Sequence, residues 1–199
     1  MSQFIESIYI NNGHSRHIDL HQQRVDQTFA HLGISSHAVQ LLTIINALNI
    51  PKDGLFKLRI VYDSTSNFTY ELLPYHYKSI HSFKLMDIGE RDYAFKYADR
   101  DWIYTLLNEA GTDDIVMLQN GMIKDSSYAN IIFQEGDTWY TPSVPLLAGT
   151  MRYHLIDQGL IQPSSIYLND LSRFSHFKLI NTMMGFDEAT TYSIETLGM

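Results

Sequence analysis

The sequence predicts an α+β fold made of two lobes. An apolar stripe at helical spacing near the start gives way to a series of strand-like runs, and helical and strand-like segments occur together again in the second half. The length of 199 residues suits two small lobes, and 45% hydrophobic with 18% charged residues is a globular composition. A boundary near Gly89 divides the chain into lobes at 1–88 and 89–199.

The first lobe begins with a strand and a tight turn. Residues 3–10 alternate loosely and carry β-branched and aromatic side chains, which is typical of a strand. The Asn-Asn-Gly sequence at 11–13 favours a hairpin with the residues that follow it. From Asp19 the apolar residues fall on a helical stripe, and Gly33 is expected to end that helix.

A second helix and three strands complete the first lobe. Ser35 or Ser36 can cap the helix, which extends to about Leu48. Three strand-like runs follow, with turn-forming residues between them, and they predict an antiparallel meander: 55–63, 67–75 and 79–88.

The second lobe is expected to contain two longer helices among short strands. One helix begins at Asp99 or Asp101 and ends at Gly111, and another begins at Thr150. The strand-like runs are bounded by glycine-containing turns: 115–119, 122–126, 130–134 and 138–141. A short helix near Asp170 and a final strand at 177–182 come last.

Composition excludes several classes of function. The net charge is −8 with no basic stripe, which argues against nucleic-acid binding. The chain has no cysteine, and its nine histidines show no metal-ligand spacing, so no metal site is expected. The N-terminal sequence lacks the features of a signal peptide, and no apolar run approaches the length of a membrane span. We therefore expect a cytoplasmic protein that does not bind membranes.

The stretch from Asp125 to Arg152 combines three features that suit an anionic ligand. It begins with a carboxylate, continues through two strand-like segments, and ends where Gly149 and Thr150 open a helix. The free N–H groups and the positive dipole end of a helix N-terminus favour a phosphate. The plainer alternative is an acidic turn, a hairpin and an ordinary helix start.

Lys96 has the most unusual surroundings of the seven lysines. It lies between Phe95 and Tyr97, where a strand pattern passes into a helical one. Partial desolvation there would lower the pKa of its ammonium group and make Lys96 a nucleophile or base. Alternatively, its stem simply lies along an aromatic ring. Arg24 follows His21 by one helical turn, so both side chains can face the same side.

Taken together, these residues match the needs of pyridoxal 5′-phosphate. A lysine binds the cofactor covalently, and a carboxylate keeps the ring nitrogen protonated so that the ring can accept electrons. An arginine and a helix N-terminus hold the phosphate dianion.

Four segments in this order resemble the class IV (fold-type IV) pyridoxal-phosphate enzymes. That family contains branched-chain and D-amino-acid aminotransferases and 4-amino-4-deoxychorismate lyase. The segments span nearly the whole chain: LHQQRV at 20–25, KYADR at 96–100, IKDSSYANIIF…YTP at 123–142 and AGTMR at 148–152.

The resemblance implies a fold, an assembly and a set of site residues. The fold would be two-lobed, with an N-terminal α+β lobe and a C-terminal β-barrel-like lobe, and the protein would be a homodimer. Lys96 would be the catalytic lysine that binds the cofactor. The cofactor-binding residues would be Arg24, Lys96, Asp125, Asn130, Gly149, Thr150 and Met151.

The sequence departs from the family pattern at two places. Asp125 stands where the family has a glutamate facing the pyridine nitrogen, so its side chain is one methylene shorter. The family also has a strand and a glycine-containing loop ahead of the segment equivalent to residues 4–10. Their absence would leave either a more open substrate pocket or a degenerate relative.

Three functions are compatible with these residues. The first is a 4-amino-4-deoxychorismate lyase that eliminates pyruvate and gives 4-aminobenzoate, a folate precursor. The second is an aminotransferase acting on branched-chain or D-amino acids. The third is a non-catalytic, degenerate cofactor-binding relative. We rank the lyase first, because a single small-molecule amine substrate needs fewer specificity contacts than two alternating substrates.

Overall fold

The computed structural model describes residues 2–34 and 39–198. The chain forms two compact units: unit 1 contains Met1–Tyr77 and Phe95–Asp99, and unit 2 contains Lys78–Ala94 and Arg100–Met199. The boundary expected from the sequence lies after residue 88, whereas the chain leaves unit 1 after Tyr77 and returns to it for five residues.

Unit 1 is built on an antiparallel sheet with the strand order β2-β1-β3-β4. Its strands agree with three of the predicted ones and add a short return strand after the predicted turn: β1 Gln3–Asn11, β2 His14–Ser15, β3 Leu55–Asp63 and β4 Phe68–Pro74. The hairpin between β1 and β2 turns at Asn12 and Gly13, whose φ angles are 49° and 80°. A turn with two positive φ values favours asparagine and glycine, so the predicted hairpin is confirmed.

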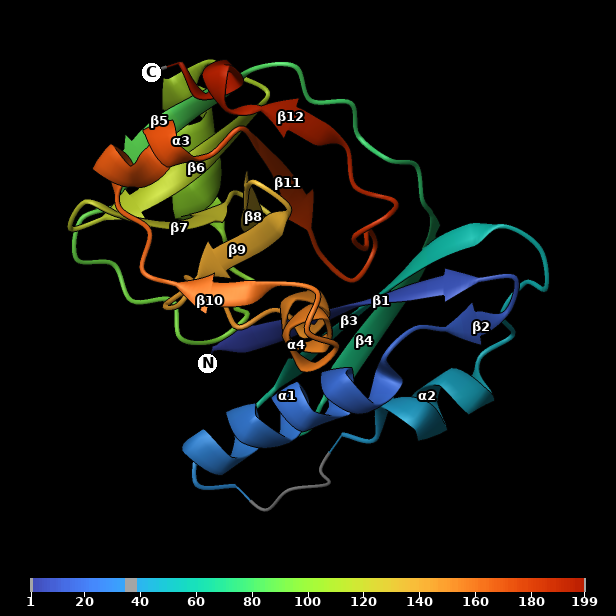
Figure 1. The fold of residues 1–199 in the computed structure, drawn as a ribbon. Coiled ribbons are helices and arrows are strands. Elements are labelled where there is room, and N and C mark those ends of the chain that lie inside the picture. Colours follow the sequence, from blue (N-terminus) through green and yellow to red (C-terminus); the bar gives the residue numbers. More distant parts are fainter. Residues whose placement is uncertain (1, 35–38, 199) are drawn as a thin grey trace. The chain divides into compact units, whose positions relative to one another are not determined.

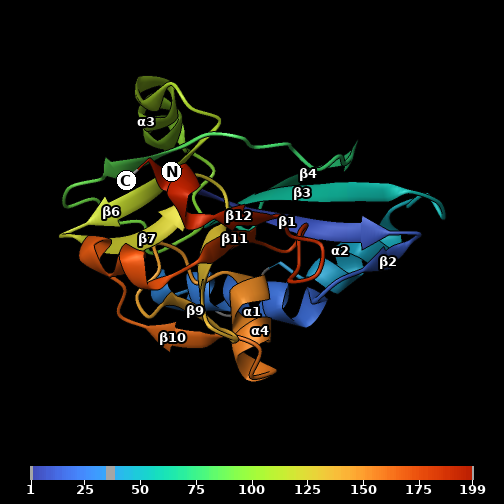
Figure 2. The same ribbon diagram turned by 45° about the horizontal axis from the view of Figure 1, so that its top comes forward.

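Two helices cover one face of this sheet, as Figure 1 and Figure 2 show: α1 Ile18–His31 and α2 Leu41–Ala47. Val25 and Phe29 of α1 pack in a core with Ile8, Leu58 and Ile60 of the sheet. The first predicted helix is therefore confirmed, and its apolar stripe is what joins it to the sheet. The second helix is shorter than expected, and its predicted start at residue 35 or 36 lies outside the described residues.

The segment Phe95–Asp99 belongs to unit 1 because its backbone pairs with β1. The N–H of Ile5 donates to the carbonyl of Lys96 at 2.9 Å, and the N–H of Ala98 donates to the carbonyl of Gln3 at 2.8 Å. β2 pairs only with the C-terminal end of β1, at Ile10 and Asn11. The N-terminal half of that edge therefore accepts the segment that carries Lys96.

The third strand of the predicted meander has a different partner. β5 Phe83–Asp87 does not join β3 and β4; it pairs in parallel with β6 Asp114–Gln119 in unit 2. The helix α3 Asp101–Ala110 lies between them in the chain and ends at Gly111 with φ 66°. Parallel neighbours need a long crossover connection, and this helix supplies one. The meander prediction was wrong for this strand because the pattern of a strand does not identify its neighbour.

Unit 2 contains an eight-stranded sheet with the order β10-β9-β8-β7-β6-β5, in which β11 pairs with both β8 and β12. The remaining strands of this unit are β7 Met122–Ser126, β8 Asn130–Glu135, β9 Thr138–Pro142, β10 Gln162–Ser164, β11 His176–Ile180 and β12 Thr191–Ser193. The other helices are α4 Thr150–Asp157 and the short 3₁₀ segments Leu168–Arg173 and Ile194–Leu197. Phe133 and Phe177 are fully buried in its main core. This core fixes the strands β7 and β8, on which the predicted carboxylate and asparagine lie.

Candidate active site

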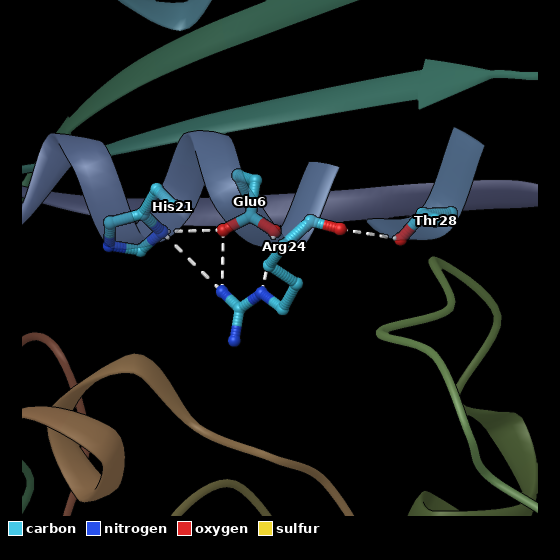
Figure 3. A network of polar contacts seen from close by, with 4 residues as sticks. All are labelled: Glu6, His21, Arg24 and Thr28. Atoms are coloured by element: carbon cyan, nitrogen blue, oxygen red, sulfur yellow. Dashed lines mark hydrogen bonds and ion pairs between the residues drawn. The ribbon is translucent and has the colours of Figure 1, made fainter. Parts of the chain in front are cut away.

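Arg24 of α1 is held by a carboxylate that the sequence analysis did not single out. Its Nε donates to Oε1 of Glu6 at 2.8 Å, and its Nη2 donates to Oε2 at 2.5 Å (Figure 3). Glu6 lies on β1 and its side chain is fully buried, while the Arg24 side chain is 12% exposed. Two parallel N–H···O bonds fix the plane of the guanidinium group.

His21 completes this cluster from one helical turn earlier. Its Nδ1 lies 2.5 Å from Oε2 of Glu6, so the ring N–H donates to the carboxylate (Figure 3). The hydroxyl of Thr28 donates to the carbonyl of Arg24 at 2.9 Å. The three-residue spacing of His21 and Arg24 therefore does place both side chains on one side of the helix, as expected.

The charges in this cluster are settled by burial and by ion pairing. Burial acts to raise the pKa of Glu6, but the charge of Arg24 and the hydrogen bonds from Arg24 and His21 hold that pKa well below its usual range. Burial lowers the pKa of His21. Glu6 is thus ionised, His21 is neutral, and the positive charge of Arg24 is balanced by the buried anion of Glu6.

Lys96 lies near the same cluster within unit 1. It is half-buried, its backbone pairs with β1 next to Glu6, and its positive charge contributes to the lowered pKa of His21. The rings of Phe95 and Tyr97 lie 6.2 and 5.4 Å from the ring of Phe4. The structure therefore brings Lys96 and Arg24, two of the predicted residues, to the same part of β1.

Asp125 and Asn130 form a directly opposed pair of β7 and β8 in unit 2. Asp125 is 4% exposed. Its Oδ1 accepts from Nδ2 of Asn130 at 2.8 Å, and its Oδ2 accepts from the N–H of Leu147 at 2.8 Å. Both carboxylate oxygens are therefore hydrogen-bonded to neutral donors of the same unit.

Asn130 also connects this carboxylate to the start of α4. Its Nδ2 donates to the carbonyl of Leu147 at 2.8 Å. A Cβ atom built on Gly149 would lie only 1.9 Å from Oδ1 of Asn130. Gly149 is the N-cap of α4 and has ordinary extended φ and ψ angles. A glycine is required there by the space that Asn130 occupies, and not by backbone strain.

Thr150 and Met151 begin α4, as the sequence predicted, but they differ in what they can offer a ligand. Thr150 is buried at 6% exposure. The side chain of Met151 packs in a core with Leu155 and Ile180. Met151 can therefore contribute to anion binding only through its backbone N–H, as expected for a helix N-terminus.

Burial raises the pKa of Asp125 to about 6. The hydrogen bonds from Asn130 and Leu147 and the charge of Arg152 act in the opposite direction. Arg152 does not bond to Asp125; its Nη2 donates to the carbonyl of Pro142 at 2.8 Å and its Nε to Thr141 at 3.2 Å. A buried acid with this pKa is stabilised as an anion by any further positive N–H that reaches it.

Other kinds of site find no support in the part of the chain that is described. Within residues 2–34 and 39–198, no group of three or more His, Asp or Glu could hold a metal ion. No helix among these residues is long and apolar enough to cross a membrane.

Comparisons with known proteins connect these residues to a family. The model of the aminotransferase class IV family matches residues 93–190. An uncharacterised protein of Haemophilus influenzae is 33% identical over 189 residues, which are 93% of this chain and all of that protein. A solved structure from Haemophilus somnus 129pt is 31% identical, covers 94% of this chain and 98% of its own, and superposes with a TM-score of 0.86. The chain belongs to the aminotransferase class IV family.

The solved relatives of this family carry descriptions of two kinds. For the Haemophilus somnus protein, 4-amino-4-deoxychorismate lyase activity has been suggested. A hypothetical aminotransferase from Mycobacterium tuberculosis, solved in a form with bound pyridoxal phosphate, is 16% identical, with coverage of 96% of this chain and 79% of its own and a TM-score of 0.76. This second likeness concerns the fold alone. The recognition of the family and its mixed α and β fold class are confirmed.

The predicted site residues divide between the two units. Lys96 and Arg24 belong to unit 1, and the remaining five belong to unit 2. Sequence reasoning missed Glu6 and Leu147. Glu6 had a usable signal, because it is the one charged residue within the mostly apolar and buried stretch of β1. Leu147 had none, since it acts through its backbone.

Proposed function

We propose that this chain is a pyridoxal-phosphate-dependent lyase that eliminates pyruvate from 4-amino-4-deoxychorismate and releases 4-aminobenzoate. Membership of the class IV family makes the chain a pyridoxal-phosphate-dependent enzyme. The lyase is favoured because the relative with 31% identity over nearly its whole length is one for which this activity has been suggested. Production of a folate precursor in the cytoplasm is part of the same proposal.

The residues present fit the cofactor, and the observation that carries this fit is the buried carboxylate of Asp125. Its pKa of about 6 means that a protonated pyridine nitrogen would convert it fully to the anion that such a ring needs. Arg24 offers a guanidinium group of fixed orientation for a phosphate dianion. Lys96 supplies a primary amine, half-buried beside Phe95 and Tyr97.

Each of these residues has a chemical role in the proposed reaction. When bound, pyridoxal phosphate supplies a ring that stabilises negative charge developing at the carbon next to the substrate amine. Nζ of Lys96 would take the ring proton from that carbon, the carbon–oxygen bond to the enolpyruvyl group would break, and enolpyruvate would leave as the substrate ring becomes aromatic. Enolpyruvate becomes pyruvate by taking up a proton at its methylene carbon, which balances the proton removed from the ring. Asp125 would keep the cofactor nitrogen protonated. Arg24 and the backbone N–H groups of residues 149–151 would hold the phosphate.

The proposal includes a homodimer. β4 is an edge strand of the sheet in unit 1, and it carries several exposed large apolar residues: Phe68, Tyr70 and Leu73, which are 44%, 50% and 41% exposed. Large apolar side chains on an edge strand are a common place for a second chain to pack. Light scattering at micromolar concentration should give twice the mass of one chain, and a monomeric mass would contradict this part of the proposal.

The test is a side-by-side assay of the purified chain loaded with pyridoxal phosphate. Incubation with 4-amino-4-deoxychorismate should release pyruvate and 4-aminobenzoate in equal amounts. A parallel assay should find little amino-group transfer from branched-chain or D-amino acids to 2-oxoglutarate. Transfer without pyruvate release would identify an aminotransferase. Neither activity in a protein that still binds the cofactor would identify a non-catalytic relative.

A further inference from the structure

We propose that Asn130 and Asp125 are positioning residues for the phosphate end of the cofactor. By binding both backbone polar groups of Leu147, they place the N–H groups of residues 149–151 where these can donate hydrogen bonds to a phosphate. The carboxylate that serves the ring nitrogen and the turn that serves the phosphate are then one connected unit. This inference deepens the proposed function and rests on it.

The first support is the way in which the turn before α4 is attached. Residues 143–149 connect β9 to α4 without helix or strand of their own. Leu147 is held on both sides: its N–H donates to Asp125 and its carbonyl accepts from Asn130. The start of the turn is held by the N–H of Ser143, which donates to the carbonyl of Ser164, and by Lys124, which donates to the carbonyl of Val144. The part next to α4 takes its position from the side-chain contacts at Leu147. Removing either side chain should therefore release the turn two residues before the N-cap of α4.

The second support is the fit between Asn130 and Gly149. Because a Cβ at position 149 would lie 1.9 Å from Oδ1 of Asn130, the amide and the N-cap backbone are packed directly together. Asn130 thus contacts the turn at two positions, by one hydrogen bond at Leu147 and by packing at Gly149. A side chain at position 149 would force Asn130 away from both Leu147 and Asp125.

The third support is that Asp125 can hold the turn and still serve the cofactor. Each oxygen of an ionised carboxylate has two acceptor positions. Oδ1 receives one bond from Asn130, and Oδ2 receives one bond from Leu147. The remaining positions suffice for a ring N–H, so binding of the ring does not require release of the turn. Asn130 itself needs no contact with the cofactor in this arrangement.

The variant Asn130→Ala tests the proposal through two ligands that differ only in the phosphate. Affinity for pyridoxal phosphate should fall at least tenfold, while affinity for pyridoxal, which lacks the phosphate, should change less than threefold. Without any cofactor, hydrogen exchange of the amides at 147–151 should become faster. A merely structural role would lower the affinity for both ligands by the same factor. That outcome, or unchanged hydrogen exchange at residues 147–151, would overturn the proposal.

A double-mutant cycle makes the test independent of overall stability. Gly149→Ala alone should reproduce the selective loss of pyridoxal phosphate binding, because the new methyl group displaces Asn130. Adding Gly149→Ala to Asn130→Ala should lower the affinity for pyridoxal phosphate little further, since the side chain that the new methyl group would meet is already gone. Additive losses would contradict the packing argument. Asp114→Asn is the matched control: Asp114 is a fully buried aspartate of the same unit, its pKa is raised by burial, and it should leave the ligand ratio unchanged.

The failure of this inference can be distinguished from failure of the proposed function. If the unaltered chain binds pyridoxal phosphate and releases pyruvate but the ligand ratio of Asn130→Ala equals that of the unaltered chain, only the positioning role is wrong. If the unaltered chain does not bind pyridoxal phosphate, both are wrong.

Discussion

Arg24 reaches Glu6 with two of its nitrogen atoms, at 2.8 and 2.5 Å from the two carboxylate oxygens. The pair joins α1 to β1, and its anion is fully buried. Arg24 therefore has its orientation before any external anion arrives. A phosphate bound there would meet a guanidinium group that is already fixed in place, which reduces the entropy lost on binding.

Glu6→Gln should destabilise the protein by about 3–5 kcal/mol, because it removes the buried anion that balances the charge of Arg24, whose side chain is only 12% exposed. Urea unfolding at pH 7 measures this loss. The matched control is Glu71→Gln, since Glu71 pairs with Arg59 at 3.4 Å in the same sheet but is 59% exposed. That change should cost less than about 1 kcal/mol. Equal losses would mean that the Glu6 pair contributes no more than a surface contact.

Acid should weaken unit 1 before unit 2. Burial lowers the pKa of His21 in the folded protein. Below the ordinary pKa of 6.5, the unfolded chain therefore binds a proton that the folded chain does not, and the free energy of unfolding falls as the pH drops. Glu6, also with a lowered pKa, adds to this loss below 4.5. Asp125 acts in the opposite direction: its pKa is raised from 3.8 to about 6, so the folded state gains stability as pH falls between these values.

Hydrogen exchange at pH 7 and pH 5 measures this difference. Amides of β1 and β3 should lose protection at pH 5 relative to amides of β8 and β11, after correction for the intrinsic rates. Asp125→Asn should reduce the gain in unit 2 and provides the control; Asp114, whose pKa burial also raises, contributes in the same direction. Equal loss of protection in both units would contradict the opposite pKa shifts of His21 and Asp125.

Asp125→Asn should lower turnover by at least tenfold at saturating cofactor, because the ring nitrogen loses its anionic partner; tenfold corresponds to about 1.4 kcal/mol in the barrier. Cofactor affinity should fall as well. Asn130 and Leu147 each donate to one oxygen of Asp125. An asparagine at position 125 has one acceptor atom and one donor atom in place of the two oxygens, so it can keep only one of these hydrogen bonds. Steady-state rates and a cofactor titration measure the two effects. Unchanged turnover would remove Asp125 from the site.

Lys96→Ala should abolish covalent attachment of the cofactor. Borohydride reduction followed by peptide mass spectrometry should find the pyridoxyl group on Lys96 in the unaltered chain and nowhere in the variant, whose turnover should fall by about 10²-fold or more. Lys178 is the informative control, because burial lowers its pKa and its Nζ lies 4.3 Å from the centre of the Phe186 ring. Lys178→Ala should keep the label on Lys96. Labelling of Lys178 would reverse the assignment.

Local features of this protein were predictable from the sequence because they depend on neighbouring residues. The Asn12-Gly13 turn, the apolar stripe of α1 and the glycine that ends α3 each follow from the preferences of a few adjacent side chains. The family could also be recognised, since its motifs are short runs that stay in order. The same runs placed Arg24 on a helix, Asp125 and Asn130 on strands, and Thr150 at the start of a helix.

Only the tertiary structure decided which distant groups meet. The sequence does not show that β5 pairs with β6, that residues 95–99 join β1, or that Glu6 is the partner of Arg24. It does not show that Leu147 is held by Asp125 and Asn130 either, because backbone groups are the same in every residue. Sequence patterns record the local preferences of side chains, whereas these contacts depend on which buried polar groups find partners once the units have packed.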